Sequence, residues 1–281
     1  MTHPPKNAVA AGSAIWSGGA MDAAAVLTAY DEQVRQRPEP DGDGWVERDD
    51  RVVRVLSTNG WAGLIWSRLG DLGRDELDAR IASEVARFVA VGNTWEWKYF
   101  SCDLPPDLPE RLVTAGLTRA EDETMLVAEI SELDLDVSLP ERVRLDDVID
   151  AEGIARVVRV HDDVFGGEHG YIGRALAAGL AHQPPTCTAV VAMAGDTPVC
   201  SGRLELHHGT DFASIWGGGT LPQWRGRGIF RAVIAHRARQ ASDLGFRYLQ
   251  VDATADSRPI LGRLGFVELT TTVPFEHPGR T

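Results

Sequence analysis

The spacing of hydrophobic and polar residues predicts strands and helices in the second half of the chain. Residues 188–193 and 199–206 are apolar runs separated by a turn signal at Gly195-Asp196, which predicts a hairpin. Residues 211–216 predict the strand that follows. Apolar residues at helical spacing also predict two helices before the hairpin, over residues 154–164 and 171–180.

The best-defined pattern is a strand, a glycine-rich turn and a helix between Ala213 and Leu244. Gly217-Gly218-Gly219 breaks the apolar strand, and Pro222 marks the turn. One face of the helix is apolar, and Gly245 is a helix stop signal. The residues of that face are Phe230, Val233, Ile234, Ala238, Ala241 and Leu244. A strand over residues 248–253 and a short helix over residues 257–264 are predicted to follow.

The first half of the chain shows the same alternation. Its predicted helices are residues 22–34, 75–91 and 108–114, and its predicted strands are residues 51–56, 62–66, 95–100 and 123–130. A turn at Asn59-Gly60 joins the first two strands. Both halves end in the order strand, helix, strand, helix, strand, and the Pro, Leu and Gly positions of their last helices correspond to within one residue. This correspondence suggests a diverged repeat, with an unrelated α/β cap as the alternative.

Composition excludes several classes of protein. The chain has 281 residues, enough for two domains, and a formal net charge of -13, which argues against nucleic acid or an anionic membrane as a partner. Its three cysteines, Cys102, Cys187 and Cys200, are far apart, which is typical of buried thiols in a reducing compartment and of neither disulfides nor a metal site. No apolar run is long enough to span a membrane, and the N-terminus does not resemble a signal peptide. We therefore expect a cytoplasmic protein.

The glycine-rich turn has the chemistry of an anion-binding site. The first N–H groups of a helix lack internal partners, and the helix dipole there favours negative charge. Arg225, Arg227 and Arg231 add guanidinium groups suited to phosphate, close to Gly226 and Gly228. A nucleoside-triphosphate loop would need Gly-Lys-Ser/Thr, and a dinucleotide fingerprint would need a third glycine where Arg231 stands. An ordinary glycine-rich turn before a surface helix is the alternative.

The segment from Leu221 to Ile229 resembles the acetyl-CoA-binding signature of the GNAT N-acetyltransferase superfamily. The signature, Gln/Arg-x-x-Gly-x-Gly/Ala, falls on Arg225, Gly228 and Phe230, and Phe230 departs from the small residue of the family. The resemblance implies acetyl-CoA as cofactor, with pantetheine between two central strands that separate near a bulge. The implied cofactor-binding residues are Gly219, Thr220, Leu221, Arg225, Gly226, Arg227, Gly228, Ile229, Phe230 and Arg231.

The resemblance also implies the fold class and the domains. We expect an α/β (α+β) chain of two GNAT-like domains, each with a central mixed sheet flanked by helices. Residues 1–20 are expected to be weakly ordered, residues 21–136 to form a degenerate GNAT-like domain, and residues 137–281 to form the acetyltransferase domain. The first domain lacks the basic turn, because acidic residues lie before its long helix, at Asp71 and Asp75.

The reaction implied by the resemblance is direct attack of an amine on the acetyl thioester. The usual tyrosine acid is replaced by Leu261, and Ser214 stands in the region of the usual glutamate base, so the catalytic residues are unknown. Asp162, Asp163 and Glu168 are candidates to bind a cationic acceptor, with a solvated loop as the alternative. We expect an N-acetyltransferase that acts on a small-molecule amine. A homodimer is possible, and no metal is expected. A catalytically silent acyl-CoA sensor and a nucleotide-binding module are the alternatives.

Overall fold

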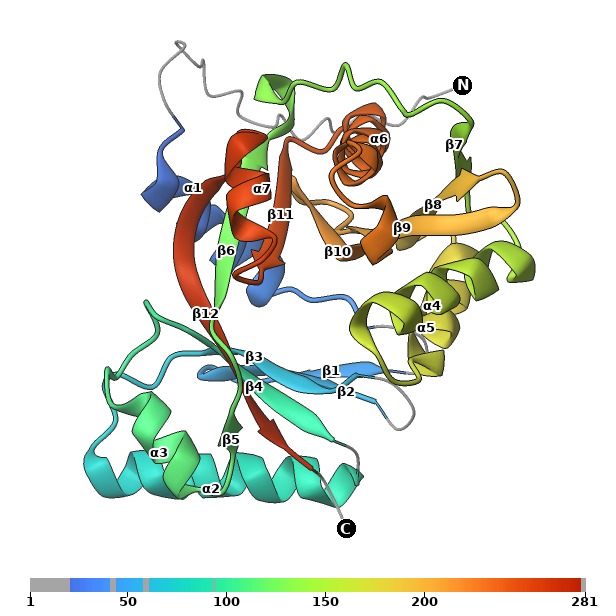
Figure 1. Ribbon diagram of the computed structural model, residues 1–281. Helices are drawn as coiled ribbons and strands as arrows, with labels where there is room; N and C mark the ends of the chain where they lie inside the picture. Colours follow the sequence, from blue (N-terminus) through green and yellow to red (C-terminus); the bar gives the residue numbers. More distant parts are fainter. Residues whose placement is uncertain (1–20, 41–43, 58–60, 93, 279–281) are drawn as a thin grey trace, which may run out of the picture.

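The computed structural model describes residues 21–40, 44–57, 61–92 and 94–278 (Figure 1). The predictions for residues 1–20 and for the turn at Asn59-Gly60 lie outside the described residues. The strands are β1 (Trp45–Arg48), β2 (Val52–Leu56), β3 (Gly63–Ser67), β4 (Trp95–Phe100), β5 (Thr118–Arg119), β6 (Glu123–Glu129), β7 (Val143–Asp147), β8 (Cys187–Ala194), β9 (Thr197–Leu206), β10 (Phe212–Thr220), β11 (Tyr248–Ala253) and β12 (Val267–His277).

The helices lie between these strands largely where the hydrophobic periodicity predicts them. They are α1 (Ala23–Tyr30), continued by a π-helical turn η1 (Asp31–Arg35), α2 (Arg74–Val91), α3 (Leu108–Thr114), α4 (Ala151–Phe165), α5 (Gly170–Ala181), α6 (Ile229–Asp243) and α7 (Arg258–Arg263). Short 3-10 turns, η2 (Ile130–Glu132) and η3 (Pro222–Trp224), complete the set for the described residues. The Asp22 side chain caps α1 by accepting from the amides of Ala24 and Ala25.

One mixed sheet of 12 strands runs through both halves, in the order β1-β2-β3-β4-β12-β6-β11-β10-β9-β8-β7, with β5 on β12. Strand β6, from the first half of the chain, lies between β11 and β12 of the second half and is antiparallel to both. The long strand β12 pairs with β6 through its first part and with β4 through its second, so it bends from one half into the other (Figure 1). The two halves therefore share their central strands.

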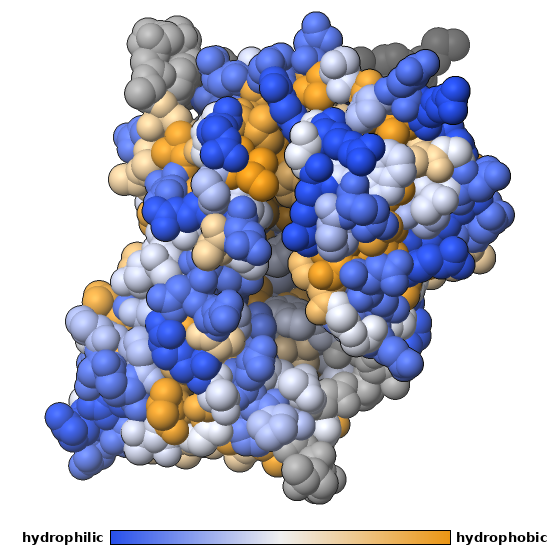
Figure 2. Space-filling model, viewed as in Figure 1, coloured by the Kyte–Doolittle hydropathy of each residue, from blue (hydrophilic) through white to orange (hydrophobic). Residues whose placement is uncertain are grey.

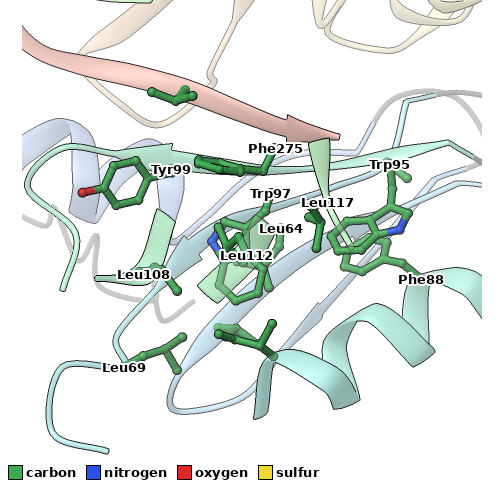
Figure 3. Close-up of a cluster of buried hydrophobic side chains, with 14 of the residues drawn as sticks. Leu64, Leu69, Phe88, Trp95, Trp97, Tyr99, Leu108, Leu112, Leu117 and Phe275 are labelled. Carbon is green, nitrogen blue, oxygen red and sulfur yellow. The ribbon is translucent and has the colours of Figure 1, made fainter. Parts of the chain in front are cut away.

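Helices cover both faces of this sheet. Helices α4 and α5 pack on one face of β8 through Val157, Leu176 and Val191, and α6 packs on the opposite face through Ile229 and Val233. In the first half, α2 and α3 cover one face, and a second core closes there around Trp95, Trp97, Phe88 and Phe275 (Figure 3). Phe88 of α2 stacks on Trp95 with ring centroids 4.2 Å apart.

Three sequence predictions need correction. The run Gly217-Gly218-Gly219 does not end its strand, because β10 continues through it as a bulge to Thr220. Leu244 is 56% exposed, since it follows the last turn of α6 and points out of its buried face. Cys102 is exposed, whereas Cys187 and Cys200 are buried as expected.

Candidate active site

The central feature of the second half is a gap between two parallel strands. β10 and β11 pair only from Phe212 with Tyr248 to Ser214 with Gln250, and they diverge beyond this point. Figure 2 shows a recess in the surface here, between the side over α7 and β11 and the side over α6 and α4. Beyond the last pair, β10 keeps its hydrogen bonds to β9 but shifts register between Trp216 and Gly219. The bulge turns the end of β10 away from β11.

Glycines make this bulge possible because helices approach it from both faces. Gly217 has a φ of +57°, which L side chains rarely adopt. A Cβ on Gly218 would lie 2.9 Å from the Phe230 ring of α6, and one on Gly219 would lie 2.8 Å from Cγ1 of Val164 in α4. Close packing at the gap therefore requires glycine at these positions, and the glycine run is not simply a flexible turn.

The chain leaves β10 and enters α6 through a loop that presents free amides. Gly226 and Gly228 have φ values of +72° and +79°, and no heavy atom lies within 4 Å of a Cβ placed on either. Gly228 is the N-cap of α6, no side chain caps the helix, and its first turn holds no acidic residue. The first intrahelical bond runs from the amide of Ala232 to the Gly228 carbonyl. Open space over uncapped amides fits a diphosphate.

The three arginines predicted to bind phosphate occupy different positions. Arg225 donates from Nε to the Thr220 carbonyl at 3.1 Å, which ties the loop to the end of β10. Arg227 donates to the Gln223 carbonyl at 3.2 Å, and its guanidinium lies 4.7 Å above the Trp224 ring. Arg231 instead forms an ion pair of 2.5 Å with Asp134, which precedes β7. Arg225 and Arg227 thus lie next to the amides, while Arg231 pairs with the segment that connects the halves.

Of the residues predicted to bind the acceptor, Asp162 holds the loop between α4 and α5. Its carboxylate accepts from the His169 backbone amide at 2.9 Å and lies 2.8 Å from His169 Nδ1. Asp163 and Glu168 are exposed. His161, which the sequence did not single out, lies closer to the gap, since a Cβ on Gly217 would be 3.4 Å from its Nδ1. Burial beside His169 and Arg203 lowers the pKa of His161 to about 4, so its ring is neutral at pH 7.

A partly buried group of charged residues lies beside β11, on the face of the sheet opposite α6, and it combines both halves of the chain. Lys98 of β4 lies 2.6 Å from a Glu123 oxygen of β6 and 3.1 Å from an Asp252 oxygen of β11. Asp252 also accepts from Gln250 Nε2 at 3.0 Å, and Gln250 Oε1 is buried with no hydrogen-bond partner among the described residues. Side chains alternate along a strand, so Asp252 lies on the same face of β11 as Gln250, just beyond the last pair with β10. We call Lys98, Glu123, Asp252 and Glu96 the acidic group.

Glu96 of β4 extends the acidic group and is expected to make stability depend on pH. Burial raises the pKa of Glu96 to about 7; Lys98 opposes the rise, and Glu123, Asp252 and Glu276 add to it. The folded protein then keeps a proton that the unfolded chain loses near pH 4.5. This contribution is complete below pH 4.5 and is lost as the pH rises through 7.

The neutral variant Glu96→Gln serves as the comparison, because it mimics the protonated carboxyl at every pH. Relative to this variant, wild type is expected to lose about 1–3 kcal/mol of unfolding free energy between pH 4.5 and 7.5, as measured by urea denaturation. Stability profiles that run parallel for the two proteins would contradict the raised pKa.

Other residues with catalytic side chains are held by structural contacts. The Ser214 hydroxyl lies 2.8 Å from His207 Nε2, and His208 Nε2 lies 2.7 Å from the Pro185 carbonyl. Leu261 is buried in the core of the second half. Ser257 stands at the N-cap position of α7, but its hydroxyl donates to the Thr254 carbonyl and caps no helix amide. In the described part of the chain, no three His, Cys, Asp or Glu residues lie as a metal site requires, and no helix is both long and apolar enough to cross a bilayer.

Comparison with known proteins identifies the fold. No family profile and no curated protein matches the sequence. A GCN5-related N-acetyltransferase from Kribbella flavida superimposes with a TM-score of 0.68 and 19% identity, over 93% of this chain and 97% of that one. A tandem GNAT protein from the clavulanic acid biosynthesis pathway matches with a TM-score of 0.56 and 14% identity, over 85% of this chain and 83% of that one.

A third match is the GCN5-related glucosamine N-acetyltransferase region of a fungal multi-domain β-N-acetylglucosaminidase. Its TM-score is 0.55 at 12% identity, over 91% of this chain and 37% of that one. At these identities the likeness concerns the fold alone. The fold of this chain is that of the GCN5-related N-acetyltransferases, some of which are tandem proteins. Within this fold lie the diverging strands, the bulge and the glycine-rich entry to α6.

Proposed function

We propose that the protein is an N-acetyltransferase that moves an acetyl group from acetyl-CoA to the amine of a small molecule. The observation that carries this proposal is the gap between β10 and β11, with uncapped amides at the α6 end and the acidic group on the opposite face. In this proposal the amides of Gly228 to Arg231 and the guanidinium groups of Arg225 and Arg227 bind the diphosphate. Backbone groups of Gly219 to Leu221 bind pantetheine.

The acceptor is proposed to be cationic, because the acidic group has a negative excess. Glu96, Glu123 and Asp252 face a single lysine, Lys98, which cannot neutralise them all. A protonated amine is attracted to such a site, and one of the carboxylates can take its proton before attack. The fungal neighbour, described as a glucosamine N-acetyltransferase, acts on an amine of this kind.

The transfer is proposed to proceed without a glutamate base on β10 and without a tyrosine acid on α7. Leu261 is buried in the core and cannot donate a proton, and the Ser214 hydroxyl contacts His207. These two observations also favour a second candidate, a catalytically silent acyl-CoA sensor.

Release of coenzyme A thiol from acetyl-CoA, measured with a panel of cationic amines and the corresponding alcohols, distinguishes the two functions. An acetyltransferase is expected to release thiol with amines only, whereas a sensor binds coenzyme A and releases none.

Arg227→Glu is expected to weaken coenzyme A binding by more than ~1 kcal/mol, because a charge-assisted phosphate contact is replaced by repulsion. Unchanged affinity in calorimetry would count against the proposed diphosphate site. Protection against thermal unfolding by ATP or NAD, and none by coenzyme A, would support a nucleotide-binding module instead.

A further inference from the structure

Arg237 is a buried cation with an unusual set of partners. It lies in the middle of α6 and is only 1% exposed. Its guanidinium donates to the carbonyls of Arg203 at 2.8 Å and Trp216 at 3.4 Å, and its Nε donates to the Val233 carbonyl at 3.2 Å. Arg203 and Trp216 are opposite each other in the β9–β10 ladder, at the last regular pair before the bulge. Arg237 therefore fastens the start of the bulge from the α6 side.

The backbone around Arg237 leaves room for this guanidinium. A Cβ on Gly202 of β9 would lie 2.6 Å from its Cζ, and one on Gly218 of the bulge would lie 3.4 Å from its Nη2. Glycines on two adjacent strands thus form the pocket. The same bulge borders the gap between β10 and β11, so the guanidinium lies directly behind one wall of the gap.

No carboxylate neutralises Arg237 among the described residues, since its hydrogen bonds go to carbonyl oxygens. Burial lowers the pKa of Arg237 to about 10; the Cys200 thiol opposes this shift and the neighbouring Arg203 adds to it. The side chain therefore stays protonated at neutral pH. Burying an unpaired charge is unfavourable, and an anion that arises nearby offsets that cost. A structural arginine in a chain of net charge -13 would more commonly face an acid.

We propose that Arg237 is a positioning residue of the acetyl transfer, one that fixes the bulge and supplies the positive potential that stabilises the departing coenzyme A thiolate. This inference rests on the proposed function. In the step, the amine lone pair forms the N–C bond to the thioester carbon. The C–S bond breaks and its electron pair leaves on sulfur, while the extra ammonium proton passes to a carboxylate or to water. A buried cation behind the gap favours sulfur as thiolate, so this chain needs no acid at position 261.

The test measures the ionisation of bound coenzyme A, which a merely structural role would not change. Thiolate absorbance is followed against pH in difference spectra of the protein with coenzyme A and with desulfo-coenzyme A. In wild type, the bound thiol is expected to titrate at least about one unit below the usual thiol value of ~8.5. Arg237→Met is expected to return it to the free value, and Arg237→Lys to keep most of the shift. Arg239→Met removes an exposed arginine of the same helix and is expected to leave the pKa of the bound thiol at its wild-type value.

Gly202→Ala provides a second variant in case Arg237→Met does not fold. Its methyl group displaces the guanidinium, the movable end of a long side chain, while the charge stays in the protein. In this variant, at least half of the downward shift in the pKa of the bound thiol is expected to disappear. An unshifted thiol in bound wild type, or a shift that survives in both Arg237→Met and Gly202→Ala, would overturn the proposed role of Arg237 alone. Failure of wild type to bind coenzyme A at all would instead overturn the proposed function.

Discussion

Replacing Gly228 with aspartate is expected to weaken coenzyme A binding at least about 100-fold, or ~2.7 kcal/mol, while the protein stays folded. Gly228 precedes the first turn of α6, and no heavy atom lies within 4 Å of a Cβ placed on it, so the substitution itself meets no steric clash there. Aspartate tolerates a left-handed backbone better than most residues. Its carboxylate would compete for the amides that we assign to the diphosphate and would repel the phosphate groups.

Gly228→Asn is the matched control, because it has the same shape and backbone preference without the charge. It is expected to weaken binding about tenfold, and calorimetric titration with coenzyme A measures both variants. Equal losses of coenzyme A affinity in the two variants would mean that the bulk of the new side chain explains the effect and that the anion contact does not. Undiminished binding in Gly228→Asp would remove the α6 terminus from the proposed site.

Replacing Trp97 with alanine is expected to lower the unfolding free energy by about 3–5 kcal/mol, although Trp97 belongs to the half without the glycine-rich turn. Its side chain is fully buried beside Phe275 of β12 in the core of the first half. Because β12 also pairs with β6 next to β11, we expect coenzyme A binding to be lost in the same unfolding transition. Urea denaturation followed by far-ultraviolet circular dichroism and by coenzyme A binding measures both effects.

Trp61→Ala is the control for this substitution, since Trp61 is 42% exposed. Its expected cost is about 1 kcal/mol or less, because surface substitutions rarely exceed that value. Two separate transitions in Trp97→Ala, with coenzyme A binding retained after the first, would show that the second half folds and binds alone.

Local patterns were sufficient to predict much of the fold. Neighbours in the sequence decide the 3.6-residue periodicity of α2 and α6, the two apolar runs of the β8–β9 hairpin and the stop at Gly245, and the structure confirms all three. The glycine-rich entry to α6 has positive φ values at Gly226 and Gly228 and no side-chain cap, and its binding of a diphosphate stays a prediction. The bulge at Gly217-Gly218-Gly219 was expected only from the family resemblance, because it depends on Val164 and Phe230, which pack from two different helices.

The polar groups around the gap could not be predicted because long-range pairing brings them together. Lys98, Glu123 and Asp252 meet only because β6 inserts between β11 and β12, and no pattern near any of the three residues announces this. Arg237 resembles a solvent-exposed residue in the sequence of α6. Its burial follows from Gly202, a residue of another strand whose role appears only in three dimensions.

The position of β12 has a consequence for how the protein is made. Phe100 of β4 pairs with Thr272 of β12, so a nascent first half has an open hydrogen-bonding edge along β4 until β12 has been synthesised. Contacts between such distant segments form slowly. We therefore expect the first half to need chaperones during synthesis, and fragments ending before β12 are expected to aggregate through that edge.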